Sequence, residues 1–235
     1  MSKDWHIIAL GGGGFSMTPD NPLLDRYIFA LARKKNPLVC FVPTASGDAE
    51  RYIGNFYNAM AAHHPQCRAT HLPLFEQKGN RAEQIAAADV IYVGGGNTFN
   101  MLTLWKAWGV DVLLRKAYER GTVMAGISAG GNCWFEQFLT DSTGSLTLMP
   151  GLGWLKGAFT PHYDGEAARR PAYQALLQKS GLSGYACDND AALHFVNEEL
   201  HQAVVGRSLA KAFLIAGGRK SVVREKKLPV LKLVA

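Results

Sequence analysis

Short apolar runs alternate along this chain with stretches of helical spacing. The strand-like runs are Trp5–Leu10, Leu38–Val42, Ala69–Leu72, Val90–Val93 and Thr122–Ala125. Apolar residues recur at helical intervals over 22–34, 50–63 and 81–88. This alternation predicts a mostly parallel sheet with helices on both faces. With 235 residues, 48% of them hydrophobic, the chain is long enough for one α/β domain spanning 1–235.

Three further segments complete the expected architecture. Asn80 is predicted to cap the helix over 81–88, with Glu83 as its capping-box partner. The segment Glu166–Ser180 is predicted to be helical, with Pro171 in its first turn. Residues Leu139–Gly157 are rich in glycine, threonine and serine, and we expect loop and short strands over the active site there.

The C-terminal part is expected to add antiparallel strands to one edge of the sheet. Ala192–Val196 and Leu200–Val205 flank a polar turn, and Ser221–Arg224 is predicted to pair with Pro229–Val234. Six basic residues are interleaved with apolar ones there: Arg219, Lys220, Arg224, Lys226, Lys227 and Lys232. This pattern is typical of the solvent face of strands, so despite a formal charge of +6 we expect no nucleic-acid surface.

The pentapeptide Gly126-Ile127-Ser128-Ala129-Gly130 directly follows an apolar run. A G-x-S-x-G sequence between a strand and a helix predicts a nucleophile elbow, in which small neighbours let the backbone turn sharply around an exposed serine. The amide of Ala129 would then stand at a helix N-terminus, ready to donate to an oxyanion. The competing interpretation is a glycine-rich turn whose serine only caps the helix.

A serine nucleophile needs a base, and His162 is the best candidate among the seven histidines. It follows a predicted strand end and precedes a polar loop, which is where sites gather in parallel sheets. The other six lie within strands, at a helix end or in a hairpin, where packing or surface roles are favoured. The order serine, then histidine, then an acid differs from that of the α/β-hydrolases, in which the acid precedes the histidine.

Several classes of protein are excluded. Cys40, Cys67, Cys133 and Cys187 show no metal-ligand spacing, so we expect buried thiols, no metal and no cofactor. The glycine loops lack the lysine and the spacing of nucleotide-binding motifs. No apolar stretch reaches the ~18 residues of a membrane span, and the start does not look like a signal peptide, so a cytoplasmic location without membrane contact is expected. A homodimer is compatible with the sequence.

Four ordered motifs now carry a resemblance over most of the chain. They are Gly94-Gly95-Gly96-Asn97-Thr98, the elbow, Pro161-His162-Tyr163 and Asp188-Asn189-Asp190-Ala191-Ala192-Leu193. Together they resemble the peptidase E and cyanophycinase family of serine peptidases. The resemblance implies a flavodoxin-like three-layer sandwich, similar to class I glutamine amidotransferases, with a mostly parallel sheet. It also implies Ser128 as nucleophile, His162 as base and a short peptide as substrate, as in dipeptidases that remove an N-terminal aspartate.

The glycine loop and a few polar residues are candidates for binding substrate. Amides of Gly95 and Gly96 could complete an oxyanion hole with that of Ala129. Asn97 could hold substrate, although helix capping is almost equally expected. Arg169 and Arg170 could bind a carboxylate bidentately, or could simply lie on a solvated helix start.

The third triad residue stays open. The resemblance implies an acid where Asn189 stands. Either Asp188 or Asp190 has taken that role, or Asn189 orients His162 as a neutral acceptor. In an extended segment both aspartates would lie on the face opposite Asn189. Asp141, for which the resemblance implies a place near the active site, is the remaining candidate for the acid or for a substrate contact.

Two classes of function therefore compete. The first is a serine peptidase on short peptides, with a carboxypeptidase-like or other amide hydrolase as a variant. The second is a non-catalytic ligand-binding module of the same fold, which Asn189 alone favours.

Overall fold

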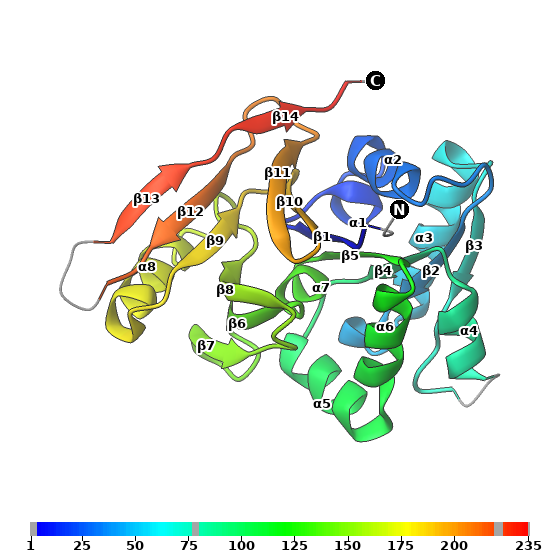
Figure 1. Ribbon diagram of the computed structural model, residues 1–235, viewed down its shortest axis with the longest axis horizontal. Helices are drawn as coiled ribbons and strands as arrows, with labels where there is room; N and C mark the ends of the chain where they lie inside the picture. Colours follow the sequence, from blue (N-terminus) through cyan, green and yellow to red (C-terminus); the bar gives the residue numbers. More distant parts are fainter. Residues whose placement is uncertain (1–3, 77–79, 219–222, 235) are drawn as a thin grey trace.

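The computed structural model describes residues 4–76, 80–218 and 223–234, and in these ranges the chain forms two β-sheets flanked by helices (Figure 1). The larger sheet contains, in spatial order, β14 (Val230–Lys232), β11 (Glu199–Val205), β10 (Ala191–Val196), β1 (His6–Leu10), β5 (Val123–Ile127), β4 (Val90–Val93), β2 (Leu38–Val42) and β3 (Arg68–His71). The smaller sheet contains β13 (Arg224–Lys227), β12 (Ala212–Ala216), β9 (Gly184–Cys187), β8 (Leu155–Thr160), β6 (Phe135–Thr140) and β7 (Thr147–Pro150).

Helices cover both faces of the larger sheet. The helices of the described chain are α1 (Gly14–Met17), α2 (Leu23–Ala30), α3 (Glu50–His63), α4 (Arg81–Ala87), α5 (Thr98–Trp108), α6 (Val110–Glu119), α7 (Ala129–Asn132) and α8 (Arg169–Ser180). A short 3₁₀ turn, η1, spans Thr44–Ser46. In Figure 1, α8 lies beside the smaller sheet and the helices from α2 to α6 gather around the larger one.

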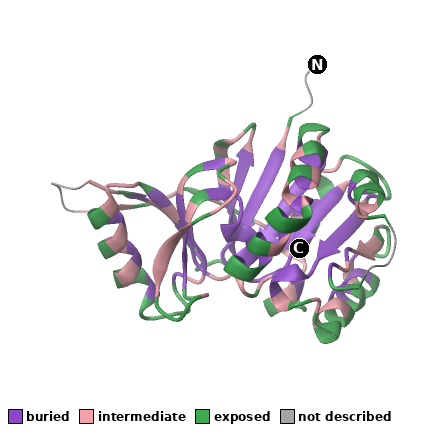
Figure 2. Cartoon of the chain, turned by 90° about the horizontal axis from the view of Figure 1, so that it is seen from below, coloured by how far each residue is buried: buried purple, intermediate pink, exposed green. Residues whose placement is uncertain are grey.

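Alternation along the buried strands divides the apolar residues between two cores. On β1, Ile8 and Leu10 pack with side chains of α1, α2 and α3, whereas Ile7 and Ala9 pack with α4 to α7 and with strands of the smaller sheet. Successive strand residues point to opposite faces, so each strand contributes to both cores. Figure 2 shows the strands as the buried centre and the outer turns of the helices as exposed.

The predicted parallel sheet with antiparallel strands at its C-terminal side is confirmed. β1, β5, β4, β2 and β3 run parallel to one another, while β10 pairs antiparallel with both β1 and β11. The cap of α4 is confirmed as well, because Oδ1 of Asn80 accepts from the amides of Ala82 and Glu83. Pro171 does lie in the first turn of α8, which begins at Arg169 instead of Glu166.

One prediction about the strands is confirmed and one is wrong. Residues 139–157 contain loop segments and short strands, as expected, and these strands are the end of β6, β7 and the start of β8 in the smaller sheet. The first strand of the smaller sheet, β6, already begins at Phe135, because α7 has only four residues and the aromatic run at 134–135 follows it closely. The segment Pro229–Val234 does not pair with the strand before it: β13 pairs with β12, and β14 runs parallel to β11 in the other sheet. Ser221 and Val222 lie outside the described residues.

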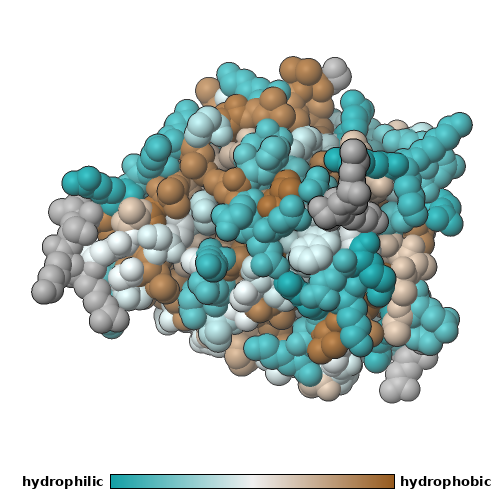
Figure 3. All heavy atoms as spheres, in the orientation of Figure 1, coloured by the Kyte–Doolittle hydropathy of each residue, from teal (hydrophilic) through white to brown (hydrophobic). Residues whose placement is uncertain are grey.

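Among the described residues, no helix could span a membrane. On the face shown in Figure 3, hydrophobic and hydrophilic residues are interspersed. Arg224, Lys226, Lys227 and Lys232 are exposed on β13 and β14, as the sequence predicts, and Arg219 and Lys220 lie outside the described residues.

Candidate active site

Ser128 lies at the turn that joins β5 to α7. Its backbone has φ 54° and ψ −110°, a left-handed conformation that is rare for a residue with a side chain and is stored mainly at functional sites. A Cβ on Gly126 would lie 2.2 Å from the carbonyl oxygen of Gly130, and a Cβ on Gly130 would lie 2.2 Å from that of Val93. The turn can close only because both residues are glycine, which is the geometry expected of a nucleophile elbow.

His162 follows β8 and is also left-handed, with φ 53°. The amide of Ser128 donates to the carbonyl of Leu10 at 3.1 Å, and the amide of His162 donates to that of Gly11 at 3.0 Å. Because Leu10 ends β1 and Gly11 follows it, the carboxyl end of β1 holds both residues at one edge of the sheet. Ser128 Oγ and the His162 ring, both described and half-buried, share no hydrogen bond here. Catalytic hydrogen bonds often tighten only in the substrate complex.

Asn189 lies in the turn between β9 and β10, and its side chain contacts the His162 ring. The distance between His162 Nδ1 and Asn189 Oδ1 is 2.7 Å. An amide oxygen only accepts hydrogen bonds, so Nδ1 must carry the proton and Nε2 is left with its lone pair. A Cβ on Gly12 would lie 2.1 Å from Asn189 Oδ1, and one on Gly165 would lie 2.7 Å from Asn189 Nδ2. The side-chain amide of Asn189 therefore lies between Gly12 and Gly165.

Asp188 and Asp190, two of the three aspartates that compete for the third position, bond to other groups. Asp188 Oδ2 accepts from the backbone amide of Lys211 at 2.9 Å. Asp190 Oδ1 accepts from the hydroxyl of Thr18 at 3.0 Å, and its Oδ2 lies 3.4 Å from Nε of Arg207. Asp141 is exposed at the end of β6. As expected, the Asn189 side chain therefore points away from those of Asp188 and Asp190. The segment 188–190 lies at a turn, however, and not in an extended strand.

The candidate oxyanion donors differ in their present partners. Ala129 is the first residue of α7, so its amide has no acceptor within the helix. The Gly95 amide donates to the Tyr52 hydroxyl at 3.2 Å, so this donor is already engaged. Gly96 is exposed and has φ 139°, which only glycine adopts readily. Their roles stay predictions, and a role for Gly95 would require the bond to Tyr52 to be given up.

The predicted substrate-binding residues also have partners within the chain. Asn97 caps α5 through Oδ1, which accepts from the amide of Asn100, and its Nδ2 donates to the carbonyl of Ser142. Arg169 is buried and its Nη2 lies 2.6 Å from Glu166 Oε2.

Arg170 is ion-paired with Glu225, and its guanidinium lies over the ring of Tyr163. Both arginines are therefore paired within the described chain. The prediction that they bind a substrate carboxylate stays open and would require these pairs to separate.

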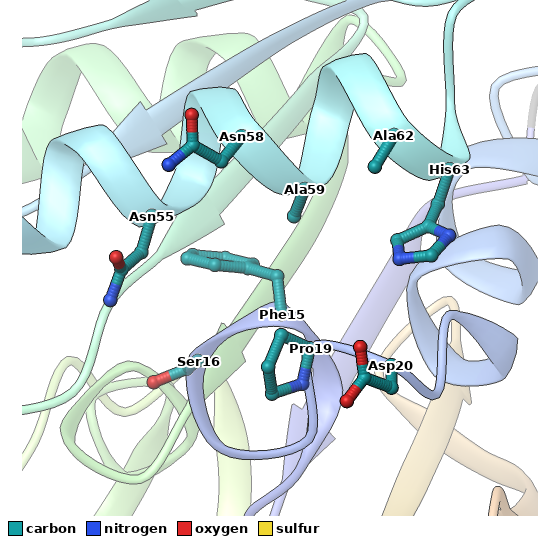
Figure 4. Close-up of a pocket in the computed structure, with 9 residues that line it drawn as sticks. All are labelled: Phe15, Ser16, Pro19, Asp20, Asn55, Asn58, Ala59, Ala62 and His63. Carbon is teal, nitrogen blue, oxygen red and sulfur yellow. The ribbon is translucent and has the colours of Figure 1, made fainter.

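A cavity of about 330 Å³ lies between α1 and α3 (Figure 4). Figure 4 shows Ser16 of α1 on one side of it and Asn55 and Asn58 of α3 on the other. The Tyr52 hydroxyl donates to Ser16 Oγ at 2.7 Å, and it also accepts from Gly95. Tyr52 therefore links the rim of this cavity to the loop that follows β4. The sequence gives no signal for Tyr52, because an aromatic residue within a helix is usually a packing residue.

Burial changes the titration of several groups near the site. Burial, together with the nearby Asp164 carboxylate, raises the pKa of Asp188 to about 6, while the bond from the Lys211 amide opposes this rise. Burial also raises the pKa of the Cys133 and Cys187 thiols well above the usual range. Such thiols stay protonated and are poor nucleophiles at neutral pH. Within the described ranges, no group of three His, Cys, Asp or Glu side chains could hold a metal ion.

Several known proteins are similar to this chain in sequence or in fold. The model of "Peptidase family S51" matches residues 7–203. The "Uncharacterized peptidase YgaJ" of Bacillus subtilis (strain 168) is 53% identical over 211 residues, which cover 89% of this chain and 91% of that protein. "Peptidase E" of Haemophilus influenzae (strain ATCC 51907 / DSM 11121 / KW20 / Rd) is 27% identical over 180 residues, 71% of this chain and 80% of that one. Among solved structures, a peptidase from an acI-B1 Actinobacterium shares the fold with a TM-score of 0.70 at 17% identity, covering 100% of this chain and 98% of the other.

Proposed function

The chain belongs to peptidase family S51 and is a peptidase, and from this premise we propose that it hydrolyses short peptides with Ser128 as nucleophile, His162 as base and Asn189 as the residue that orients the base. The observation that supports this most strongly is the 2.7 Å contact between His162 Nδ1 and Asn189 Oδ1 at the sheet edge where the left-handed Ser128 lies. A proton fixed on Nδ1 leaves Nε2 as the base, which is what a serine nucleophile needs.

In the proposed reaction, Ser128 Oγ attacks the peptide carbonyl carbon while His162 Nε2 takes its proton. The amide of Ala129 donates to the oxyanion that forms. The C–N bond then breaks as Nε2 returns the proton to the leaving amine, which leaves an ester on Ser128. Water, deprotonated by the same nitrogen, attacks this ester and releases the acid product together with free Ser128.

A neutral third residue changes the energetics of this cycle. The imidazolium that forms after proton transfer is stabilised by the dipole of the Asn189 amide instead of a full negative charge. Asp188 is too engaged with Lys211 to replace it. We therefore propose a slower enzyme than one with a carboxylate at this position, but one with the same order of events.

The proposed substrates are short peptides without a requirement for an acidic side chain. Arg169 and Arg170, the cations that follow His162 in the chain, are paired with Glu166 and Glu225. A substrate carboxylate would have to break one of these pairs. For this reason we do not extend the aspartate preference implied by the family resemblance to this chain.

The second candidate is a ligand-binding module without catalysis, and the observation that favours it is again Asn189, which stands where the resemblance implies an acid. In that case peptides would bind at the sheet edge and leave intact. The two functions differ in a single result, the release of products.

The test is hydrolysis of a library of dipeptides and tripeptides with free and blocked ends, followed by mass spectrometry. We expect the wild-type protein to release amino acids and the Ser128→Ala variant to release none above background. Ser180→Ala, a serine substitution on α8, is the matched control and should behave as the wild type does. Binding of peptides without any release by the wild type would favour the module.

A further inference from the structure

Two charged residues, Arg207 and Asp164, contact the backbone of Asn189 and take no part in the proposed reaction. We call this pair the clamp. Arg207 lies just after β11 and Asp164 lies two residues after His162. We propose that Arg207 and Asp164 are positioning residues that hold Asn189 against His162, an inference that rests on the proposed function of that pair.

The contacts of the clamp engage both polar groups of the Asn189 backbone. Asp164 Oδ1 accepts from the Asn189 amide at 2.8 Å. Arg207 Nη2 donates to the Asn189 carbonyl at 3.1 Å and to Asp164 Oδ2 at 2.8 Å. With its amide and carbonyl both fixed from outside, Asn189 directs its side chain toward His162.

The clamp also joins segments that come from different parts of the fold. Asp164 belongs to the loop after β8, in the smaller sheet, and Arg207 follows β11, in the larger one. Asn189 lies between β9 and β10, at the point where the chain passes from one sheet to the other. The distance between the His162 loop and the Asn189 turn therefore depends on how the two sheets are placed against each other. The Arg207–Asp164 ion pair connects the two sheets directly at this point.

The need for a clamp follows from the neutral side chain of Asn189. A carboxylate would be drawn to the imidazolium by charge, whereas an amide relies on the alignment of a single hydrogen bond. A displacement of about 1 Å in a catalytic group can cost about 10²-fold in rate. Firm backbone contacts supply the alignment that charge does not.

The same pair should matter little for folding. The Arg207 side chain is 42% exposed and that of Asp164 is 34% exposed. Exposed ion pairs contribute little to the free energy of unfolding. Asp164→Asn should therefore change the rate and leave the melting temperature almost unaltered, which separates positioning from a general structural role. Arg207→Ala also removes the 3.4 Å contact with Oδ2 of the buried Asp190, so a modest fall in melting temperature is expected for that variant.

The experiment compares Arg207→Ala, Arg207→Lys and Asp164→Asn with the wild type. For Arg207→Ala we expect kcat to fall about 10- to 100-fold with KM almost unchanged. Arg207→Lys should recover only part of the loss, because an ammonium cannot bond Asp164 and the Asn189 carbonyl in the fixed geometry of a guanidinium. Arg115→Ala, which removes two ion pairs on α6, is the matched control and should keep full activity.

A second readout does not depend on activity. The ¹⁵N chemical shifts of the His162 ring, assigned by their loss in His162→Ala, report which nitrogen carries the proton. We expect the Nδ1–H form in the wild type and a mixture of both forms in Arg207→Ala. A variant whose kcat and ring shifts both match the wild type would overturn the clamp. If the wild type hydrolyses no peptide, the proposed function fails, and the ring shifts alone decide for or against the clamp.

Discussion

In the proposed reaction, three side chains from three separate loops have to meet at Ser128. Each loop contributes a residue whose position is set mainly by its backbone: Ser128 and His162 are left-handed, and Asn189 precedes the left-handed Asp190. Sequence patterns predicted Ser128 and His162, because both depend on short motifs at strand ends. Asn189 remained one of four candidates, since the direction of a side chain in a turn depends on contacts with Lys211, Thr18 and Arg207 that no local pattern encodes.

Replacing the nucleophile should abolish the reaction and spare the fold. For Ser128→Ala we expect kcat to fall by about 10⁴- to 10⁶-fold, because the hydroxyl forms the covalent intermediate. His162→Ala should be about as damaging, and the double variant little worse, since the two act as a unit. Steady-state kinetics on the best library peptide measures this, and losses that simply add would show that the residues act separately.

Substitution of the candidate orienting residues should show whether Asn189 or Asp188 orients His162. Asn189→Ala should lower kcat by about 10²- to 10⁴-fold through loss of the correct tautomer. Asp188→Ala should be mild, because its carboxylate bonds the backbone of Lys211. Asn189→Asp keeps the shape that fits between Gly12 and Gly165, and its charge should raise kcat by about tenfold. If Asp188→Ala proves the more damaging alanine variant, Asp188 is the orienting residue.

Among the secondary-structure elements, the segment formed by the end of β1 and the loop after it holds the backbone of the site in place. Its successive carbonyls at Leu10, Gly11 and Gly12 accept from the amides of Ser128, His162 and Asp190. The sequence marked this loop only as a glycine run without nucleotide-binding spacing. Its role could not be predicted, because it acts through backbone atoms that every residue type possesses.

A methyl group on this loop should disturb the site without unfolding the chain. In Gly12→Ala the new Cβ would meet Asn189 Oδ1 at 2.1 Å, so the amide must move away from His162 and kcat should fall by about 10²-fold. Gly54→Ala is the matched control, because a Cβ there meets nothing within 4 Å. Equal kcat for the two variants would contradict the proposed position of Asn189.

Beneath the same loop, Asp25 of α2 accepts from the Phe15 amide and is buried. Burial raises the pKa of Asp25 to about 7 from 3.8, although the nearby Tyr92 hydroxyl and the bond from the Phe15 amide oppose the shift. A carboxyl group with a raised pKa in the folded state binds more protons there than in the unfolded chain. Its contribution to the free energy of unfolding is therefore full below pH 3.8 and is lost as the pH rises through about 7.

Asp25→Asn should remove that pH dependence. An asparagine can still accept from Phe15 and carries no charge to bury, so the variant should gain stability relative to the wild type at pH 8 compared with pH 5. Urea denaturation of both proteins at the two pH values measures the difference. A stability difference that is the same at both would mean that Asp25 does not titrate in this range.

For the whole molecule, the two sheets meet at the site. The larger sheet positions Ser128 through β5, the smaller sheet positions His162 through β8, and Asn189 lies where the chain passes between them. The parallel sheet was predictable from its buried, strand-length apolar runs. The smaller sheet was not, because glycine-containing turns separate several of its short strands, so the sequence there resembles loops. The place of β14 in the larger sheet was not predictable either, because its partner β11 is distant in sequence.

We expect the protein to be active without added metal ions or nucleotides. Neither a chelator nor ATP or NAD should change the activity or the melting temperature, because the glycine loops lack a phosphate-binding lysine and the described residues include no metal-binding cluster. Differential scanning fluorimetry with and without each compound checks this. A rise of several degrees with a nucleotide would assign the glycine loops to nucleotide binding.

Covalent labelling by a fluorophosphonate, read by intact-protein and peptide mass spectrometry, tests whether Ser128 is the nucleophile. An activated serine should take one adduct per chain on the peptide that contains Ser128. Labelling should be absent in Ser128→Ala and much slower in His162→Ala and Asn189→Ala. An unlabelled wild type that still cleaves peptides, or an equal adduct on Ser128→Ala, would contradict the assignment of Ser128 as the nucleophile.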